Sequence, residues 1–166
     1  VGVNNYPNAM DASATTKPMP PEESGPVPAW RMAAPVERLR RRTERHAAKT
    51  GQAPSVLLLT RGDVKMRMAR ANFSRNFFGC AGFTVAESSE LAPADLVVLC
   101  SADAEYLAMA QDVVPRVKVP VIVAGNPVDQ LDALRAAGVA GFVHVGSDLV
   151  ATLAEWQDRL GLEAVR

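Results

Sequence analysis

The feature that most constrains the fold is a series of short apolar segments that begins near residue 54 and alternates with segments of helical period. The runs Val56-Leu57-Leu58-Leu59 and Leu96-Val97-Val98-Leu99 contain no polar residue. A strand that helices cover on both faces of a parallel sheet has this pattern, whereas a strand with one face in water alternates apolar and polar residues. We therefore expect a parallel sheet between two layers of helices.

The boundaries of these segments predict five strands and four helices. Strands are expected at residues 55–60, 83–86, 95–100, 119–124 and 140–145, and helices at about 65–80, 102–114, 128–137 and 148–160. Ser147 or Asp148 can cap the last helix, and Gly138 and Gly161 mark helix ends. This pattern predicts a flavodoxin-like α/β domain with strand order 2-1-3-4-5 and a ligand crevice between strands 1 and 3.

Upstream of this domain the sequence changes character twice. Residues 1–29 contain six prolines and no helical period, which is typical of an extended linker that is disordered when isolated. Residues 30–53 include strong helix formers from Ala34 to about Lys49, with a proline near the start, and predict one charged helix with a narrow apolar stripe. Residues 54–166 form the α/β domain.

The charge balance argues against electrostatic binding to large anionic partners. The chain has 18 basic and 18 acidic residues, so its bulk charge gives no reason to bind nucleic acid or a membrane surface. Glu37 and Glu44 interrupt the arginines of the upstream helix, which favours an exposed face or a salt-bridged subunit contact there. No apolar run approaches the ~20 residues of a membrane span, and no signal-peptide pattern is present. We expect a cytoplasmic protein.

Histidine and cysteine are too sparse to predict metal chemistry. Cys80 and Cys100 form neither a C-x-x-C pair nor a zinc-ligand pattern, and Cys100 ends an apolar strand, where a buried thiol is expected. His144 ends the fifth strand with no second nitrogen or sulfur donor nearby in the pattern, and His46 lies among arginines. The sequence therefore predicts no metal site.

The first helix of the domain contains most of the aromatic residues. Phe73 and Phe77 are four residues apart, which places them on one face and predicts core packing. Phe78 points elsewhere. We expect Phe78, Met66 or Met68 to reach into the ligand crevice and keep the domain compact, or Phe78 to lie in an interface.

The candidate site is the loop Thr60 to Met68, which follows the first strand at the edge where a doubly wound sheet binds its ligand. The loop has no histidine, no glycine-rich phosphate-binding turn and no nucleophile. The polar side chains around the crevice are Thr60, Arg61, Asp63, Lys65, Ser101, Asp103, Glu105, Asn126 and Asp148. Asp63 and Lys65 could hold a phosphate or a proton, but a solvated charged rim is the commoner use of such residues, and we predict no catalytic residue.

A receiver-type phosphorylation domain would have the same fold. It would need an aspartate after strand 3, a hydroxyl after strand 4 and a lysine after strand 5. The chain has Ser101, Asn126 and Val145 near those points. This alternative is therefore excluded.

The loop after the first strand resembles that of the cobalamin-binding domain in the methylmalonyl-CoA mutase family. There it reads D-x-H-x-x-G, and its histidine ligates cobalt. Counting from Asp63 puts Lys65 at the histidine and Met68 at the glycine, whereas counting back from Ala81-Gly82-Phe83, which resembles the family's LGF, puts Arg67 at the histidine. Protonated lysine and arginine offer no lone pair to a metal, whereas neutral imidazole does.

Further stretches carry the same resemblance. Ser101-Ala102-Asp103 is similar to the family's S-x-L pattern with an acid in place of leucine, and Ala124-Gly125 keeps one of two glycines. Val1-Gly2-Val3-Asn4-Asn5-Tyr6-Pro7 resembles the last strand of the mutase barrel, and Trp30-Arg31-Met32-Ala33-Ala34-Pro35 resembles the entry to the segment after it. The chain is thus identified as a C-terminal fragment of the small, non-catalytic subunit type, with the barrel end and linker in residues 1–29 and a degenerate cobalamin-binding domain.

The resemblance implies a function. In this family the large subunit interconverts methylmalonyl-CoA and succinyl-CoA by adenosylcobalamin radical chemistry, so the cofactor is expected there and this chain is expected to be a structural partner in a heterodimer. Its vestigial cofactor-binding candidates are Asp63, Lys65, Ser101 and Gly125. Two alternatives stay open: a domain that holds cobalamin without the lower histidine, and a stand-alone interaction module.

Overall fold

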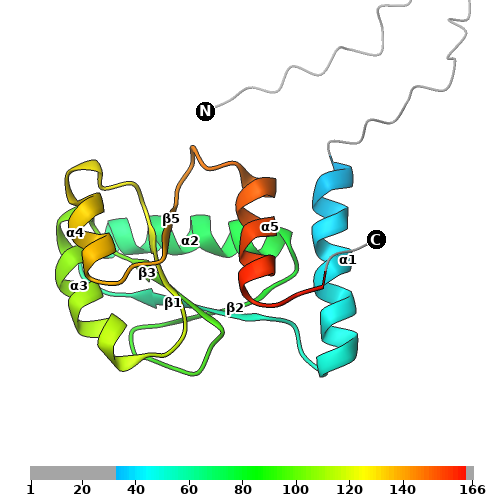
Figure 1. Cartoon of the computed structure of the whole chain (residues 1–166). Helices are drawn as coiled ribbons and strands as arrows, with labels where there is room; N and C mark the ends of the chain where they lie inside the picture. The colour runs from blue at the N-terminus through cyan, green and yellow to red at the C-terminus, as the bar shows by residue number, and fades with distance from the viewer. Residues whose placement is uncertain (1–32, 164–166) are drawn as a thin grey trace, which may run out of the picture. The chain divides into compact units, whose positions relative to one another are not determined.

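A computed structural model of the chain describes residues 33–163, and the expectations for residues 1–29 lie outside this range. Five parallel strands form one sheet in the order β2-β1-β3-β4-β5 (Figure 1). The strands are β1 (Ser55–Thr60), β2 (Thr84–Ser88), β3 (Leu96–Cys100), β4 (Val121–Ala124) and β5 (Gly141–Val143). The strand order that the sequence predicts is therefore confirmed.

Three strands are shorter than the sequence predicts, β3 by a single residue at its start, and β2 spans 84–88 instead of 83–86. β4 begins at Val121, because Pro120 has no N–H to donate, although its carbonyl still accepts a hydrogen bond from β3 at 3.0 Å. β5 ends at Val143, because His144 starts a turn: its N–H donates to Oγ of Ser147 at 3.0 Å, and the N–H of Ser147 donates back to its carbonyl at 2.9 Å. The sheet is therefore longest at its centre.

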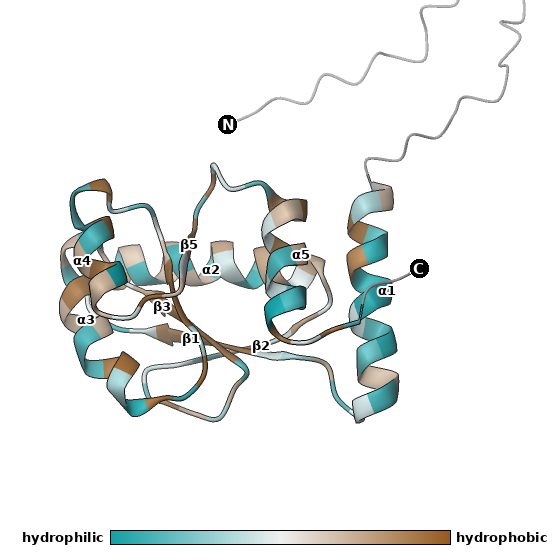
Figure 2. Ribbon diagram, in the orientation of Figure 1, coloured by the Kyte–Doolittle hydropathy of each residue, from teal (hydrophilic) through white to brown (hydrophobic). Residues whose placement is uncertain are grey.

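Helices cover both faces of the sheet. One core cluster packs α2 and α5 on the face of Leu58 and Val98, and a second packs α3 and α4 on the face of Leu57 and Val97. The strands at the centre are mostly brown in Figure 2, as their apolar runs predict. The helices are α2 (Val64–Cys80), α3 (Tyr106–Val113), α4 (Leu131–Ala136) and α5 (Leu149–Arg159), with short 3-10 turns η1 (Asp103–Glu105), η2 (Val114–Arg116) and η3 (Val128–Gln130).

The aromatic residues of α2 agree with the prediction only in part: Phe77 lies in the core as predicted. Phe78 is fully buried, with its ring centroid 5.4 Å from that of Phe77 and 6.0 Å from that of Phe83. Phe73 is only partly buried, 5.5 Å from Phe77. The expectation that Phe78 reaches the crevice or an interface is therefore wrong. It lies in the core because the chain turns back directly after α2, at Ala81-Gly82, and brings Phe83 over its ring.

Helix α1 (Ala33–Thr50) packs against α5. The side chain of Gln157 is fully buried, and its Nε2 donates to the carbonyl of Leu39 at 2.8 Å and to Oγ1 of Thr43 at 2.9 Å. The guanidinium of Arg42 donates to Asp158 at 2.5 Å and to two backbone carbonyls of the C-terminal segment. The charged helix is thus fixed to the domain by polar contacts around a small apolar stripe.

Candidate functional site

The carboxyl ends of β1 and β3 meet where the strand order reverses, and two of the predicted site residues follow β1: Asp63 in the loop and Lys65 in the first turn of α2. Asp63 is the N-cap of α2, and its Oδ1 accepts the N–H of Met66 at 2.8 Å. Lys65 is exposed and has neither a hydrogen bond nor an ion pair with any side chain in residues 33–163. The structure therefore does not join Asp63 and Lys65 as a pair.

Ser101, at the end of β3, is buried and lies against Glu105. Its Oγ is 2.8 Å from the carbonyl oxygen of Arg61 and 2.5 Å from Oε2 of Glu105, so its single proton donates to one of them at a time. The same Oε2 accepts the N–H groups of Asp63 at 3.2 Å and Ala102 at 3.3 Å. One carboxylate thus bridges the loop after β1 and the loop after β3.

Gly62 leaves the space that this carboxylate occupies. Its φ of 75° lies in the left-handed region, and a Cβ atom there would overlap the carboxylate of Glu105. The hydroxyl of Ser101 and the N–H groups of Asp63 and Ala102 lower the pKa of Glu105, because they donate to its ionised form. An ionised side chain of the protein itself therefore fills this end of the crevice.

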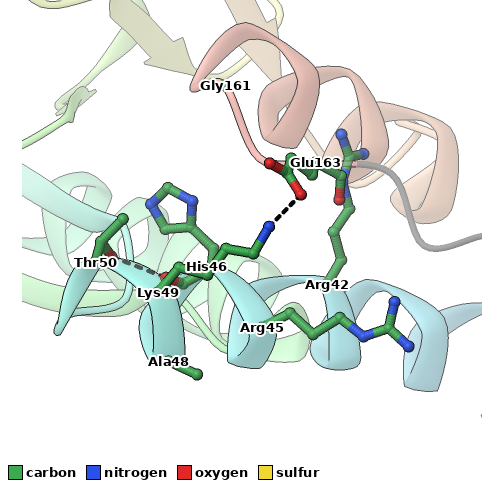
Figure 3. A pocket seen from close by; sticks show the side chains of 8 residues that line it. All are labelled: Arg42, Arg45, His46, Ala48, Lys49, Thr50, Gly161 and Glu163. Carbon is green, nitrogen blue, oxygen red and sulfur yellow. Dashed lines mark hydrogen bonds and ion pairs between the residues drawn. The ribbon is translucent and has the colours of Figure 1, made fainter.

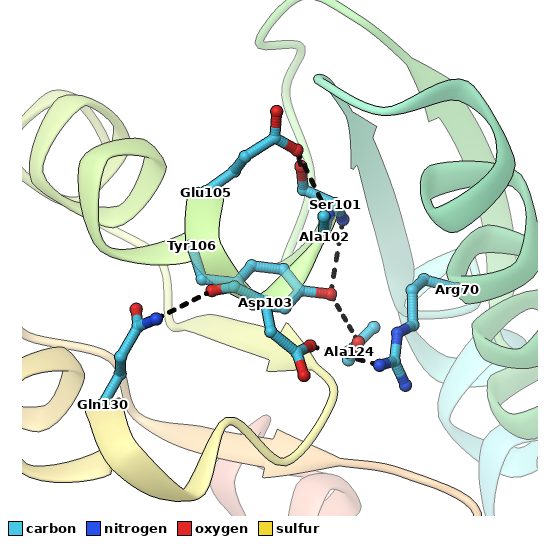
Figure 4. Close-up of polar contacts among 8 residues, drawn as sticks. All are labelled: Arg70, Ser101, Ala102, Asp103, Glu105, Tyr106, Ala124 and Gln130. Carbon is cyan, nitrogen blue, oxygen red and sulfur yellow. Dashed lines mark hydrogen bonds and ion pairs between the residues drawn. The ribbon is translucent and has the colours of Figure 1, made fainter.

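Tyr106 closes the neighbouring part of the crevice from the start of α3 (Figure 4). Its hydroxyl donates to the carbonyl of Ala124 at 2.5 Å and accepts the N–H of Ser101 at 3.3 Å, and the whole side chain is buried. Burial raises the pKa of Tyr106, so the phenol is neutral at physiological pH. The ends of β3 and β4 are therefore linked through one phenol.

An ion pair covers Gly125. The guanidinium of Arg70 lies 3.2 Å from Oδ1 of Asp103. A Cβ atom on Gly125 would lie 3.2 Å from the ring of Tyr106, 3.4 Å from Oδ1 of Asp103 and 3.5 Å from Cζ of Arg70. Three side chains of the protein thus occupy the space above this glycine, and one of them is the acid that replaces the leucine of the S-x-L pattern.

The side chains that fill the crevice are not the ones expected to fill it. Met68 is 55% exposed and Phe78 lies in the core, so both expectations are wrong, and Met66 is half-buried at the start of α2. The sequence indicated the two acids after β3 but missed Tyr106 and Arg70. One signal was available: Tyr106 is the single aromatic residue of α3 and begins that helix directly after the polar loop.

The remaining metal-binding residue types have local structural roles. Among residues 33–163, no three histidine, cysteine, aspartate or glutamate side chains are grouped so that they could hold a metal ion. Nδ1 of His144 accepts the N–H of Gly146 at 3.1 Å. Burial is the main cause that raises the pKa of the Cys100 thiol to about 12.

No helix among residues 33–163 is long and apolar enough to cross a membrane.

Sequence relatives decide the assignment. No family model matches the chain. Over 98% of its length, however, it is 34% identical to the methylmalonyl-CoA mutase small subunit of Porphyromonas gingivalis. The chain is a homologue of the C-terminal part of methylmalonyl-CoA mutase small subunits. This small-subunit homologue is also 28% identical, over 97% of its length, to the small subunit of Streptomyces virginiae.

The small-subunit homologue spans less than a third of the length of these relatives, 29% and 28% respectively. Among solved structures, it is similar to a response regulator from Thermotoga maritima, with a TM-score of 0.42 and 17% identity over 64% of this chain and 97% of the other. It is likewise similar to an orphan response regulator of H. pylori, with a TM-score of 0.41 and 16% identity over 64% and 96% of the two chains.

Proposed function

We propose that this chain is part of the small subunit of a methylmalonyl-CoA mutase and acts there as a structural partner of the catalytic large subunit. The observation that carries the proposal is the crevice between β1 and β3, which Glu105, Tyr106 and the Arg70–Asp103 ion pair fill from within. The homology to small subunits supports the assignment to this isomerase. A heterodimer with the large subunit, in the cytoplasm, is part of the proposal.

The residues of this chain do not fit cobalamin, the cofactor that the family resemblance implies. A lower axial ligand needs a nitrogen with a free lone pair, and the protonated side chains of Lys65 and Arg67 have none at neutral pH. The space above Gly125, where the family brings backbone close to the cofactor, contains Tyr106, Asp103 and Arg70. We therefore place the adenosylcobalamin of the holoenzyme in the large subunit, together with the interconversion of methylmalonyl-CoA and succinyl-CoA.

A cobalamin titration tests this part of the proposal. Equilibrium dialysis of adenosylcobalamin and hydroxocobalamin against the purified chain should show no retention, and their absorption spectra should stay as in buffer. The Lys65→His variant restores a nitrogen ligand but leaves the crevice filled, so it should also show no retention. Retention by the wild-type chain, with or without nitrogen coordination, would contradict the proposal.

The second candidate is a domain that holds cobalamin without the lower histidine. The retained Ser101 and Gly125 favour it, and it predicts retention in the dialysis experiment with a spectrum that shows no protein nitrogen on cobalt. Against it, Ser101 is already hydrogen-bonded to Glu105, and the side chains of Tyr106 and Asp103 bound the space above Gly125. The two candidates therefore predict opposite results in one measurement.

Assembly and turnover test the structural role. The complete small subunit should copurify with the large subunit, which a stand-alone interaction module would not do. In the assembled heterodimer, Lys65→Ala and Ser101→Ala should leave turnover nearly unchanged. Abolished turnover in a stably assembled heterodimer would show that the domain takes part in the reaction.

A further inference from the structure

One side of α1 presents arginines to the solvent. Arg38, Arg41 and Arg45 are exposed and follow each other at spacings of three and four residues, so they form a continuous strip along the helix, which we call the α1 basic stripe. Its only ion pair among residues 33–163 joins Arg41 to Glu37, whose Oε2 lies 4.0 Å from the guanidinium. Arg38 and Arg45 form no ion pair in this part of the chain.

Most arginines in the rest of the described domain form ion pairs with carboxylates of the domain itself. Six of them form ion pairs with carboxylates at distances up to 3.9 Å: Arg61, Arg70, Arg75, Arg116, Arg135 and Arg159. On the buried side of α1, Arg42 pairs with Asp158. Among residues 33–163, most arginines outside α1 are thus paired, with Arg67 as the exception, whereas Arg38, Arg40 and Arg45 of α1 form no ion pair.

The stripe leads into a groove between α1 and the C-terminal segment (Figure 3). The groove has a volume of about 530 Å³ and is lined by Arg42, Arg45, His46, Ala48, Lys49, Thr50, Gly161 and Glu163. Its one acid is already neutralised, because Glu163 pairs with Lys49, which lowers the pKa of that carboxyl. Arg45 belongs to both the stripe and the groove, so the positive surface is continuous from one to the other.

We propose that the α1 basic stripe and this groove dock an acidic surface of the large subunit. The inference rests on the proposed function, because it takes the large subunit as the partner. An arginine fork binds a carboxylate through two parallel hydrogen bonds, and arginine is enriched in protein interfaces whereas lysine is depleted. The stripe consists of three arginines and no lysine, which is the composition that such a surface favours.

A nucleic acid would be the other anionic partner of a basic helix. The stripe has no aromatic side chain on which bases could stack, and Glu37 and Glu44 lie on the same helix, where they would repel phosphates. A partner protein can place its carboxylates opposite the arginines and away from Glu37 and Glu44. A nucleic acid carries a phosphate at every nucleotide and cannot avoid these two glutamates in the same way. The observations therefore favour a protein surface.

The test reverses the charge of the stripe in the complete small subunit. The variant R38E/R41E/R45E should bind the large subunit about tenfold or more weakly than the wild type, because charge pairs that lose water at an interface are strongly coupled. The matched control R116E/K118E/R135E makes the same change in net charge on exposed residues far from α1 in the sequence and should bind as the wild type does. Raising the salt concentration should weaken wild-type binding and leave the stripe variant nearly unaffected.

The outcomes separate the inference from the proposed function. If the wild-type subunit does not bind the large subunit, the proposed function fails. If it binds and the stripe variant binds equally well, the function stands and the inference is overturned. Thermal unfolding of both variants checks the fold, and should the triple variant not fold, R45E and R45Q replace it in the same assay. Tight binding of duplex DNA that the stripe variant loses, with unchanged subunit binding, would also overturn the inference.

Discussion

At the scale of single residues, the ionisation of Glu105 makes the stability of the filled crevice depend on pH. Its native pKa is lowered, chiefly by the hydroxyl of Ser101 and then by two backbone N–H groups, so the folded state favours the ionised carboxyl. The stabilisation is therefore present above the unfolded pKa of about 4.3 and is lost as the pH falls through the lower folded value.

The comparison of wild type with Glu105→Gln measures this effect. Urea unfolding should show the wild type to be more stable at neutral pH, and the difference should shrink as the pH falls below about 5. Because the pKa values of Asp112 and Glu163 are also lowered, only the difference between the two proteins reports on Glu105. A difference that stays constant with pH would contradict the account.

Phe78 gives a second prediction at this scale. Its ring is fully buried between those of Phe77 and Phe83. Phe78→Ala should therefore lower the free energy of unfolding by about 3–5 kcal/mol, as measured by denaturant titration. Val145→Ala serves as the control, because Val145 is 88% exposed and the change should stay within about 0.5 kcal/mol.

At the scale of elements, α1 is held by contacts that can be removed separately from the sheet. Gln157→Ala deletes the buried amide that donates to Leu39 and Thr43, and it should lower the free energy of unfolding by about 1–3 kcal/mol. Amide hydrogen exchange should become faster in α1 and stay slow in β1 and β3. Glu155→Ala, on the exposed side of α5, should change neither the free energy of unfolding nor the exchange rates. If Gln157→Ala accelerated exchange equally throughout the domain, α1 would not be a separable element.

The elements were predicted from the sequence more completely than the site. Uninterrupted apolar runs such as Leu96 to Leu99 identify strands covered on both faces, and the strand order follows from the fold class that they imply. The helices after β3 and β4 begin about one turn later than predicted, since 3-10 turns precede them. The filling of the crevice was not predicted, because Tyr106 and Arg70 act through tertiary contacts that no local pattern encodes.

At the scale of the whole molecule, Cys100 reports on global unfolding. It lies in the central part of the sheet with no exposed surface, and its pKa is raised to about 12, whereas Cys80 is only partly buried. At about pH 8 a thiol reagent should label Cys80 quickly and Cys100 only at the rate of global unfolding. In Cys80→Ser, fast labelling in the absence of denaturant would mean that the sheet opens locally.

The close approach of Gly62 and Glu105 has a consequence for how related sequences can diverge. A Cβ atom at position 62 would push the carboxylate of Glu105 out of its hydrogen bonds with Ser101, Asp63 and Ala102, and the positive φ there favours glycine as well. We therefore expect relatives that carry a non-glycine residue at position 62 to lack these hydrogen bonds. The same coupling should appear in a double-mutant cycle, in which Gly62→Ala destabilises the wild type more than it destabilises Glu105→Ala.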